Sequence, residues 1–506
     1  MKKVNRRRFL STTAAAGPGL LLRPGAQAGR AASNGRPRNV LILMSDQHRP
    51  YAMGFRGDTV AHTPNLDAFA GTALCFERAY CSDPVCASSR ASMLTGLYSH
   101  HHGVYTNTYP WPFEHKTTGE YFGRAGYMTG IVGKMHFVDG QRHGFAYNLD
   151  FNEWFQYLGP KTKIYADELG APDDGSGQPQ VESEWKAVRD PWAPVRTPDG
   201  RQGYNHPGRV SLLPEEDHFE SFVARESIRF LTDHGTRQPF LLIASFLKPH
   251  NPHMPSERFF RMYRPEDMKL SDTWGKVDLA KVPQEIVHRI KSPTACPELL
   301  DPKWAKVRMA CYYDCIAQMD EQLGTVLAAL RQLGLEDNTI VVYLSDHGEM
   351  LSDHGLWEKF VFYGPSLGIP FLIRVPGVTS GGVRSNTPIS LVQLLPTLME
   401  LCGLEAPAGI DGTSFAASLR DPGHTMENTI FAEFALNSRG AKYLIHDGRF
   451  KCSYYTHDMP ELYDLRDDPK EMNNLAIQKP YQGKVDELQA RLFAWHQPAP
   501  GTKGFI

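Results

Sequence analysis

Residues 84–96 read Pro84-Val85-Cys86-Ala87-Ser88-Ser89-Arg90-Ala91-Ser92-Met93-Leu94-Thr95-Gly96, a proline-containing loop that leads into a helix-like segment. Ser88 and Ser89 can cap that helix, and the positive end of a helix dipole favours a thiolate or a bound oxyanion. Arg90, about one turn after Cys86, adds a positive charge. The pattern therefore has two interpretations: a reactive cysteine, or a cysteine that packs as a small hydrophobe beside a surface arginine.

Two apolar runs end in polar residues that suit a metal ion. Residues 39–44 and 339–344 are typical of strands buried on both faces of a parallel sheet. The polar residues that follow them are Asp46, Gln47, Asp346 and His347. Because loops at the carboxyl ends of strands form the site in open α/β sheets, these four are candidate ligands of Ca²⁺, with Mn²⁺ or Mg²⁺ as alternatives. A plain loop cap is the competing interpretation for Asp46.

Basic side chains also follow two expected strands. Lys134 and His136 come after residues 127–133, and side chains two residues apart on an extended chain point to the same side. His250 follows an expected strand over residues 240–246, and nearby prolines exclude a helix there. Solvated or purely structural residues are the alternative in each case.

Together these motifs resemble the sulfatase family of the alkaline-phosphatase superfamily, over roughly residues 38–475. The matching segments are Thr63-Pro64-Asn65-Leu66-Asp67, residues 79–96, Gly133-Lys134-Met135-His136, Lys248-Pro249-His250, Ser345-Asp346-His347-Gly348-Glu349 and the later Lys359. In that family the cysteine of a Cys-x-Pro-x-Arg motif is oxidised to formylglycine, the catalytic aldehyde. Ser88 stands here in place of the proline.

The resemblance implies a function and a set of roles. The expected catalytic residues are Cys86, Arg90, Lys134, His136, His250 and Lys359, and the expected metal ligands are Asp46, Gln47, Asp346 and His347. A formylglycine-generating enzyme would mature Cys86, and the substrate would be a sulfated small molecule or glycan. One alternative is a phosphodiester or phosphonate monoester hydrolase, and another is a non-catalytic protein that binds sulfated glycans.

The expected fold is α/β, with a large, mostly parallel sheet between helices and a small C-terminal antiparallel α+β subdomain. The catalytic domain would span residues 38–425 and the subdomain residues 426–506. Residues 140–215 show little periodicity, so we expect an insertion that folds over the site and determines substrate specificity. Three consecutive histidines at 100–102 could bind metal, but we favour a solvated loop.

Residues 1–28 are typical of a Tat-type signal peptide, with twin arginines, an alanine-rich run and a small-residue cleavage site. The apolar run is too short for a stable membrane anchor. These features predict a periplasmic or secreted protein. The net charge of −2 over 506 residues offers no general attraction to nucleic acid, so an anionic substrate must be held by local cations.

Overall fold

The first apolar run forms β1 (Asn39–Asp46), which is buried along its whole length. It pairs in parallel with β6 (Phe240–Pro249) on one side and β7 (Thr339–Ser345) on the other. The computed structural model describes residues 38–497 except 109, 112–113, 138–139, 170–206, 294–295, 424–427 and 437. The expected signal peptide and the middle of the expected insertion lie outside the described residues.

β1 lies in the interior of a sheet with the strand order β5-β4-β6-β1-β7-β8-β2-β9. The remaining members are β2 (Leu74–Phe76), β4 (Met128–Gly133), β5 (Tyr147–Leu149), β8 (Phe371–Arg374) and β9 (Val383–Ser385). β8 runs antiparallel to both of its neighbours, whereas the other neighbouring strands are parallel. A short parallel pair, β3 (Ala79–Tyr80) and β10 (Ile389–Ser390), lies outside this sheet.

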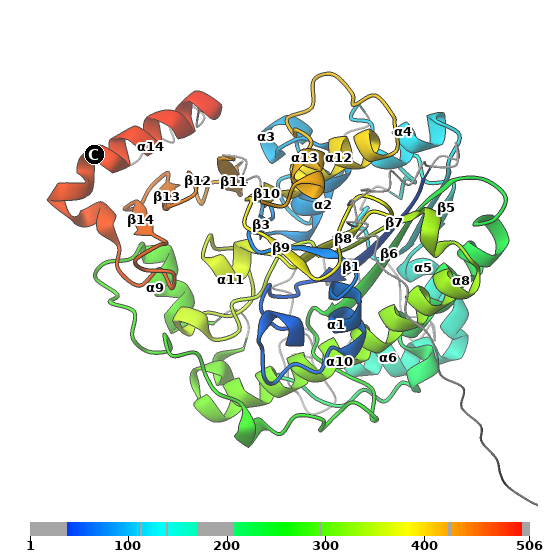
Figure 1. The fold of residues 1–506 in the computed structure, drawn as a ribbon. Coiled ribbons are helices and arrows are strands. Elements are labelled where there is room, and N and C mark those ends of the chain that lie inside the picture. Colours follow the sequence, from blue (N-terminus) through cyan, green and yellow to red (C-terminus); the bar gives the residue numbers. More distant parts are fainter. Residues whose placement is uncertain are drawn as a thin grey trace, which may run out of the picture. The chain divides into compact units, whose positions relative to one another are not determined.

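Helices cover both faces of the sheet, because successive side chains of a buried strand point to opposite sides. The face that carries Ile42 packs against α2 (Cys86–Thr95), α4 (Thr118–Arg124), α12 (Leu394–Leu401) and α13 (Ala416–Arg420). The face that carries Leu43 packs against α1 (Pro64–Ala70), α5 (Phe151–Leu158), α8 (Phe219–His234) and α10 (Pro302–Gln332). Figure 1 shows these two layers on either side of the strands.

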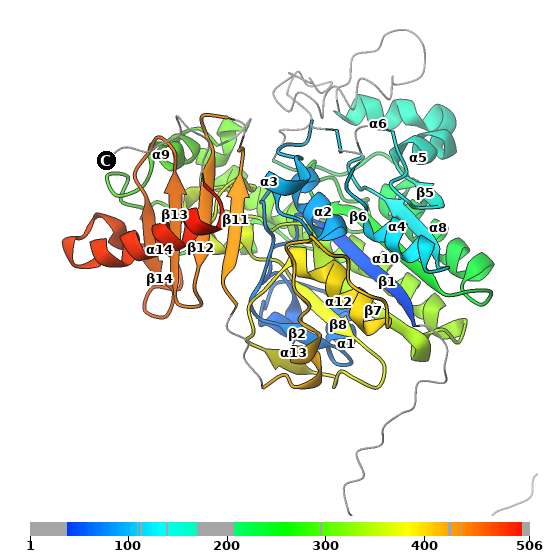
Figure 2. The same ribbon diagram turned by 90° about the horizontal axis from the view of Figure 1, so that it is seen from above.

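The C-terminal part forms a separate antiparallel sheet. Its strands are β11 (Ile430–Phe434), β12 (Lys442–His446), β13 (Phe450–Tyr455) and β14 (Glu461–Asp464), and α14 (Gln482–Trp495) packs across them. Figure 2 shows the four strands side by side with α14 over them. The expected α/β class with an antiparallel subdomain is confirmed. Sequence alone does not predict β11, whose short run is interrupted by the acidic Glu433.

Two segments expected to be irregular contain helices. The first part of residues 140–215 forms β5, α5 and α6 (Thr162–Leu169), and Trp154 of α5 is buried against Phe219 of α8. The three histidines form α3 (Ser99–His102), in which His102 is buried. Two further short helices are α9 (Gln284–Lys291) and α11 (Gly364–Leu367).

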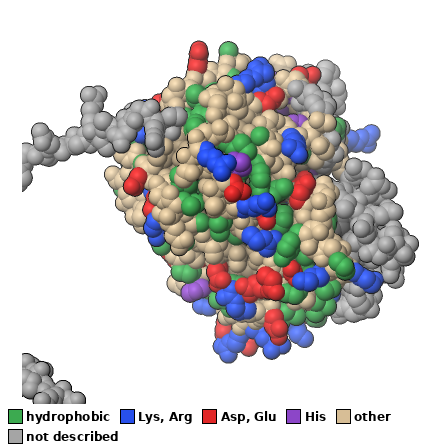
Figure 3. All heavy atoms as spheres, turned by 90° about the vertical axis from the view of Figure 1, so that its right-hand side faces the viewer, with side chains coloured by type: hydrophobic (Ala, Val, Ile, Leu, Met, Phe, Trp, Pro, Cys, Tyr) green, Lys and Arg blue, Asp and Glu red, His purple; other side chains and the backbone are tan. Residues whose placement is uncertain are grey.

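On the face drawn in Figure 3, Lys and Arg side chains are interspersed with Asp and Glu side chains, so neither sign of charge dominates that view. Among the described residues, no helix combines the length and the apolar character needed to cross a bilayer.

Candidate active site

Loops at the carboxyl edge of the sheet converge on Cys86, the first residue of α2. Its buried Sγ lies 3.2 Å from Nε2 of His347 and 3.7 Å from Oδ1 of Asp46. The ammonium groups of Lys359 and Lys134 approach the same sulfur at 3.3 Å and 3.7 Å. The ends of β1, β4 and β7 therefore bring acidic, basic and imidazole groups to one thiol.

Arg90 holds the two carboxylates of this cluster together. It lies one turn after Cys86 on α2 and is fully buried. Its Nε donates to Oδ2 of Asp346 at 2.8 Å, and its Nη2 donates to Oδ2 of Asp46 at 2.9 Å. Nη1 donates to Oγ of Ser245 at 3.0 Å and to the carbonyl of Lys134. Arg90 is thus placed to position the carboxylates.

The donor set fits a divalent cation. Oδ2 of Asp46 is occupied by Arg90 and, at 2.6 Å, by Lys134, so Oδ1 is the oxygen that faces Cys86 and His347. Nδ1 of His347 donates to the Gly348 carbonyl at 3.0 Å, which leaves Nε2 directed at the cluster. One ligand atom from each of Asp46, Cys86, Asp346 and His347 lies within 4.8 Å of the others.

The electrostatics of the paired carboxylates also favour a cation. Burial would raise the pKa of Asp46, and so would Cys86, but Lys134, His250 and Arg90 hold it below its usual range. The pKa of Asp346 is instead raised, by burial and by the charge of Asp46. A metal ion between the two carboxylates would relieve this repulsion.

The surroundings of Cys86 favour its thiolate. Burial alone would raise the pKa of the thiol, but Lys134, Lys359 and His347, with a hydrogen bond from His136, lower it well below its ordinary value. A thiol with a depressed pKa in a polar cluster behaves differently from a cysteine packed in an apolar core. The structure therefore favours the first interpretation of residues 84–96.

Gln47 connects the cluster to a residue that sequence reasoning does not assign. Its Oε1 accepts a hydrogen bond from Lys359 at 2.7 Å, and its Nε2 donates to the buried carboxylate of Glu349. Glu349 also accepts hydrogen bonds from the backbone of Leu351, at 2.9 Å, and of Glu358, at 2.6 Å. Glu349 thereby holds the loop that presents Lys359. Glu349 directly follows Asp346-His347-Gly348 in the sequence, and this position is the signal that could have identified it.

His250 and His136 complete the cluster from neighbouring strands. Nε2 of His250 lies 2.8 Å from the Lys359 ammonium, and burial together with Lys134 and Lys359 lowers the pKa of His250 to about 4. Burial also lowers the pKa of His136. His136 and Gln47 both have positive backbone φ angles, 67° and 65°, a conformation that residues other than glycine seldom adopt.

Two residues with similar local sequences lie outside this group. Asp353, in a second Asp-His-Gly sequence at residues 353–355, forms an ion pair with Arg49 at 2.6 Å. Lys248 is paired with Glu220 at 3.4 Å. The structure thus brings together Cys86, Arg90, Lys134, His136, His250, Lys359, Asp46, Gln47, Asp346 and His347.

Two hollows border the cluster. One is lined by His250 and Lys248 together with the aromatic residues Trp154, Tyr165 and Phe219. The other is lined by Lys134, His136, Met135, Phe137, Phe151 and Asp150, with Gly133 and Asn148. Each combines cluster residues with aromatic side chains, but the first has space for little more than one water molecule and the second for none.

Comparison with known proteins agrees with this geometry. The family model described as sulfatase matches residues 38–404, and the model described as N-sulphoglucosamine sulphohydrolase, C-terminal, matches residues 352–497. An arylsulfatase of Clostridium perfringens is 29% identical over 464 residues, which cover 89% of this chain and 92% of the relative. A choline-sulfatase of Rhizobium meliloti is 29% identical over 479 residues, covering 91% and 86%.

Among solved structures, the phosphonate monoester hydrolase of Agrobacterium radiobacter has a TM-score of 0.75 at 24% identity, covering 91% of this chain and 95% of that one. At this identity the likeness concerns the fold alone. The sulfatase model, by contrast, covers well over half of the sequence. This chain belongs to the sulfatase family, a family of sulfuric ester hydrolases.

Proposed function

We propose that this protein hydrolyses a sulfate ester with a formylglycine derived from Cys86 and a bound Ca²⁺, with Mn²⁺ or Mg²⁺ as alternatives. The observation that carries the proposal is the buried Cys86 sulfur 3.7 Å from Asp46 and 3.2 Å from His347. Two carboxylates, an imidazole and an amide oxygen form an oxygen-rich set that suits a hard cation.

Asp46, Gln47, Asp346 and His347 would hold the cation. When bound, the cation polarises a sulfate oxygen and lowers the pKa of an attacking hydroxyl. A hydrated aldehyde at residue 86 supplies two hydroxyls on one carbon, one for attack at sulfur and one for release of sulfate. Arg90 keeps the two metal-binding carboxylates in place through its hydrogen bonds to both.

The remaining residues neutralise charge and move protons. Lys134 and Lys359, both directed at Cys86, would bind the sulfate oxygens. His250 lies beside Lys359 and would contact the sulfate or the departing alcohol oxygen. His136, whose pKa is lowered by burial, is neutral near pH 7 and can accept a proton. Over the whole reaction, the ester and water become an alcohol, sulfate and a proton.

The substrate would be a sulfated small molecule or glycan, since the relatives named above are an arylsulfatase and a choline-sulfatase. We also propose the domain limits 38–425, with an insertion at 140–215, and 426–506. A start of the subdomain near 426 is supported by the start of β11 at Ile430.

Maturation by a formylglycine-generating enzyme and export by the Tat-type signal at residues 1–28 belong to the same proposal. Amino-terminal sequencing of protein recovered from the periplasm or medium should begin just after residue 28. Recovery of the protein only from the cytoplasm, with residues 1–28 intact, would contradict the export.

The central test is Cys86→Ala, together with mass spectrometry of the peptide that contains residue 86. Wild-type protein should carry an aldehyde at that position and hydrolyse an aryl sulfate, whereas the variant should lose this activity and keep its circular dichroism spectrum and melting temperature. Full residual activity in the variant would refute the nucleophile assignment.

The same assay separates the alternatives. Faster hydrolysis of an aryl phosphonate than of an aryl sulfate would favour the phosphonate monoester hydrolase, whose fold this chain shares. An unmodified Cys86 in active-site peptides from the native host, combined with binding of a sulfated glycan without turnover, would favour the non-catalytic protein.

A further inference from the structure

A second group of potential metal ligands lies where α3, β11 and the end of α14 meet. It consists of His100 on α3, Glu433 on β11 and His496, the residue that follows α14. One ligand atom from each of the three lies within 4.8 Å of the others. The group shares no residue with the Cys86 cluster.

Glu433 and His100 are held together by several hydrogen bonds. Nδ1 of His100 lies 2.9 Å from each carboxylate oxygen of Glu433, and the His100 backbone N–H donates to Oε1 at 2.7 Å. The Glu433 side chain is completely buried, and its own backbone N–H donates to the Ser82 carbonyl at 3.0 Å. Nδ1 of His100 and the Glu433 carboxylate are therefore already as close together as two ligands of one metal ion.

His496 contributes a second imidazole. Its ring stacks on that of His100, with centroids 4.0 Å apart and an interplanar angle of 27°. Within the described part of the chain, ring contacts but no hydrogen bonds reach its side chain. Burial, with His100 and His101, lowers the pKa of His496 to about 4, so the ring is neutral near pH 7 and keeps a lone pair.

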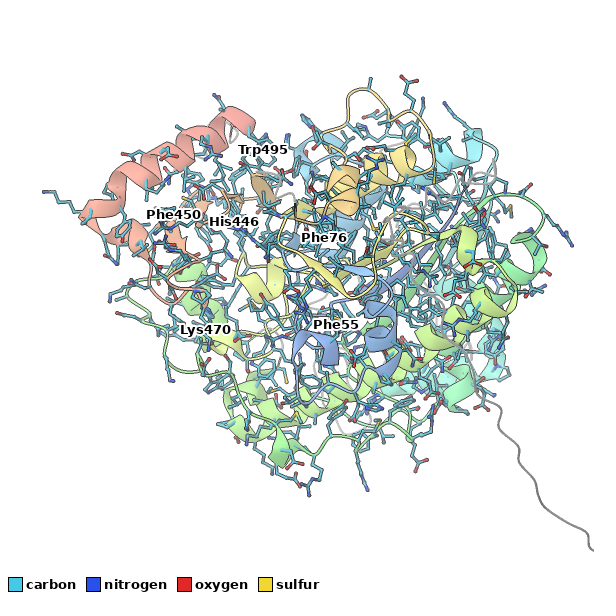
Figure 4. All side chains as sticks on the ribbon, viewed as in Figure 1. Phe55, Phe76, His446, Phe450, Lys470 and Trp495 are labelled. Carbon is cyan, nitrogen blue, oxygen red and sulfur yellow. The ribbon has the colours of Figure 1, made fainter. Side chains whose placement is uncertain are left out.

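Aromatic residues hold this group in place. The ring of Trp495 lies 4.9 Å from His100, 4.8 Å from Tyr98 and 4.5 Å from Phe431, measured between centroids. Figure 4 shows Trp495 at the end of α14, on the side that faces the rest of the structure. This packing fixes the chain end that carries His496.

Two buried carboxyl groups, those of Asp83 and Glu433, lie near each other in this neighbourhood. Asp83, three residues before Cys86, is buried, and its pKa is raised by burial and by the charge of Glu433. A cation bound at Glu433 would offset this repulsion. His101, whose ring centroid lies 4.1 Å from that of His100, is a possible further ligand, although its Nδ1 is 2.8 Å from Asp411.

We propose that His100, Glu433 and His496 bind a Zn²⁺ ion that links the end of the C-terminal helix α14 to β11 and to α3. Two imidazole nitrogens and a carboxylate are a usual donor set for Zn²⁺, whereas the active-site set is richer in oxygen. The ligand atoms lie within 4.8 Å of one another, and an ion with Zn–N bonds of about 2.0–2.1 Å would lie between them. The ion would stabilise the junction and would take no part in hydrolysis.

The test is calorimetric titration of Zn²⁺ into metal-stripped full-length protein without a polyhistidine tag, with excess Ca²⁺ present to occupy the active site. His496→Ala removes an imidazole that makes no hydrogen bond to the described residues, so the variant should still fold. His457→Ala is the matched control, because His457 is an exposed histidine in the turn between β13 and β14.

We expect wild-type protein and His457→Ala each to bind one Zn²⁺ tightly. This binding should raise the melting temperature of both proteins. His496→Ala should bind this ion at least about tenfold more weakly and lose the gain, since even outer-shell changes at metal sites cost 10–100-fold. Equal affinity and equal thermal shift in all three proteins, or no tight Zn²⁺ binding in the wild type, would overturn the proposal.

Discussion

At the scale of single residues, the two ends of the Gln47 amide have different neighbours. The oxygen faces the Lys359 ammonium and the nitrogen faces the Glu349 carboxylate. Only an amide satisfies both, because a carboxylate would repel Glu349 and an amine would repel Lys359. An amide therefore suits a position between a cation and a carboxylate.

Gln47→Glu should therefore make stability depend on the metal. Without a cation the new carboxylate faces Glu349 in a buried site, and we expect a loss of roughly 1–3 kcal/mol in the free energy of unfolding. Bound Ca²⁺ should recover much of this loss, because it adds a positive charge beside the new carboxylate. The measurement is the melting temperature in chelator and in excess Ca²⁺.

The control for this change is Gln332→Glu, at the exposed end of α10. It should alter the melting temperature little under either condition. A Gln47→Glu protein with the same loss of stability in chelator and in Ca²⁺ would mean that residue 47 does not sense the metal.

Each motif residue of the site could be predicted from its own local sequence. The residues that hold the motif residues in place could not. Cys86, Asp46, Asp346 and Lys134 stand in recognisable local patterns. Ser245, by contrast, is an ordinary strand residue in the sequence, and its hydroxyl contacts Arg90 at 3.0 Å only after β6 lies beside β4. A contact that depends on the register of two strands cannot be recognised from the sequence around either residue.

At the scale of elements, β4 ends beside β6 at the residue that leads into Lys134. Gly133, the last residue of β4, has a φ of +103°, and a Cβ added there would lie 1.9 Å from the Ser245 carbonyl oxygen. A side chain at this position would force the strands apart. Glycine is therefore required by both the backbone conformation and the space.

Gly133→Ala should lower the free energy of unfolding by roughly 3 kcal/mol, the sum of a left-handed backbone cost and an overpacking cost. Activity should fall as well, because Lys134 and His136 follow directly. Gly126→Ala is the matched control: its φ is +85°, but a Cβ there meets nothing within 4 Å. It should cost only about 1 kcal/mol. Urea unfolding that gives equal losses for the two variants would exclude the steric argument.

Long elements were predictable from the sequence, and short ones were not. β1 and β7 are continuous apolar runs, and α10 has the length and pattern of a helix, so their type is evident. β2, β9 and β5 contain three residues each, and such segments become strands only because a neighbour supplies hydrogen bonds. β11 is likewise a strand because it pairs with β12.

At the scale of the whole described molecule, polar contacts connect the C-terminal sheet to the catalytic part. Nη2 of Arg78 lies 2.9 Å from Nε2 of His446, whose Nδ1 is 3.1 Å from the Phe450 carbonyl. Tyr363 donates to Glu461 at 2.6 Å, and Lys442 donates to the Phe360 carbonyl at 2.6 Å, next to Lys359. The subdomain thus supports the loop that carries a site lysine.

The His446 contact predicts a pH dependence of stability. Burial, together with Arg78 and Lys451, lowers the pKa of His446 from 6.5 to about 4. Between these values the unfolded chain takes up a proton that the native state does not, so stability present above about pH 6.5 is lost as the pH falls toward 4. The full difference is on the order of 3 kcal/mol.

His446→Gln should therefore reduce the slope of unfolding free energy against pH between 6.5 and 4, measured by urea unfolding at several pH values. His457→Gln, at an exposed histidine of the same subdomain, should leave the slope as in the wild type. An unchanged slope in His446→Gln would show that other groups cause the acid sensitivity.

The sequence by itself determined the fold class, the family and the identities of the residues that now surround Cys86, because long apolar runs and local motifs report burial and chemistry within a short window. Only the tertiary structure decided which atoms meet: the role of Arg90 as a holder of two carboxylates, the bond between Gln47 and Glu349, and the group of His100, Glu433 and His496. Most of these contacts join residues separated by hundreds of positions. Their partners are selected by strand register and by packing at a distance, which no local pattern encodes.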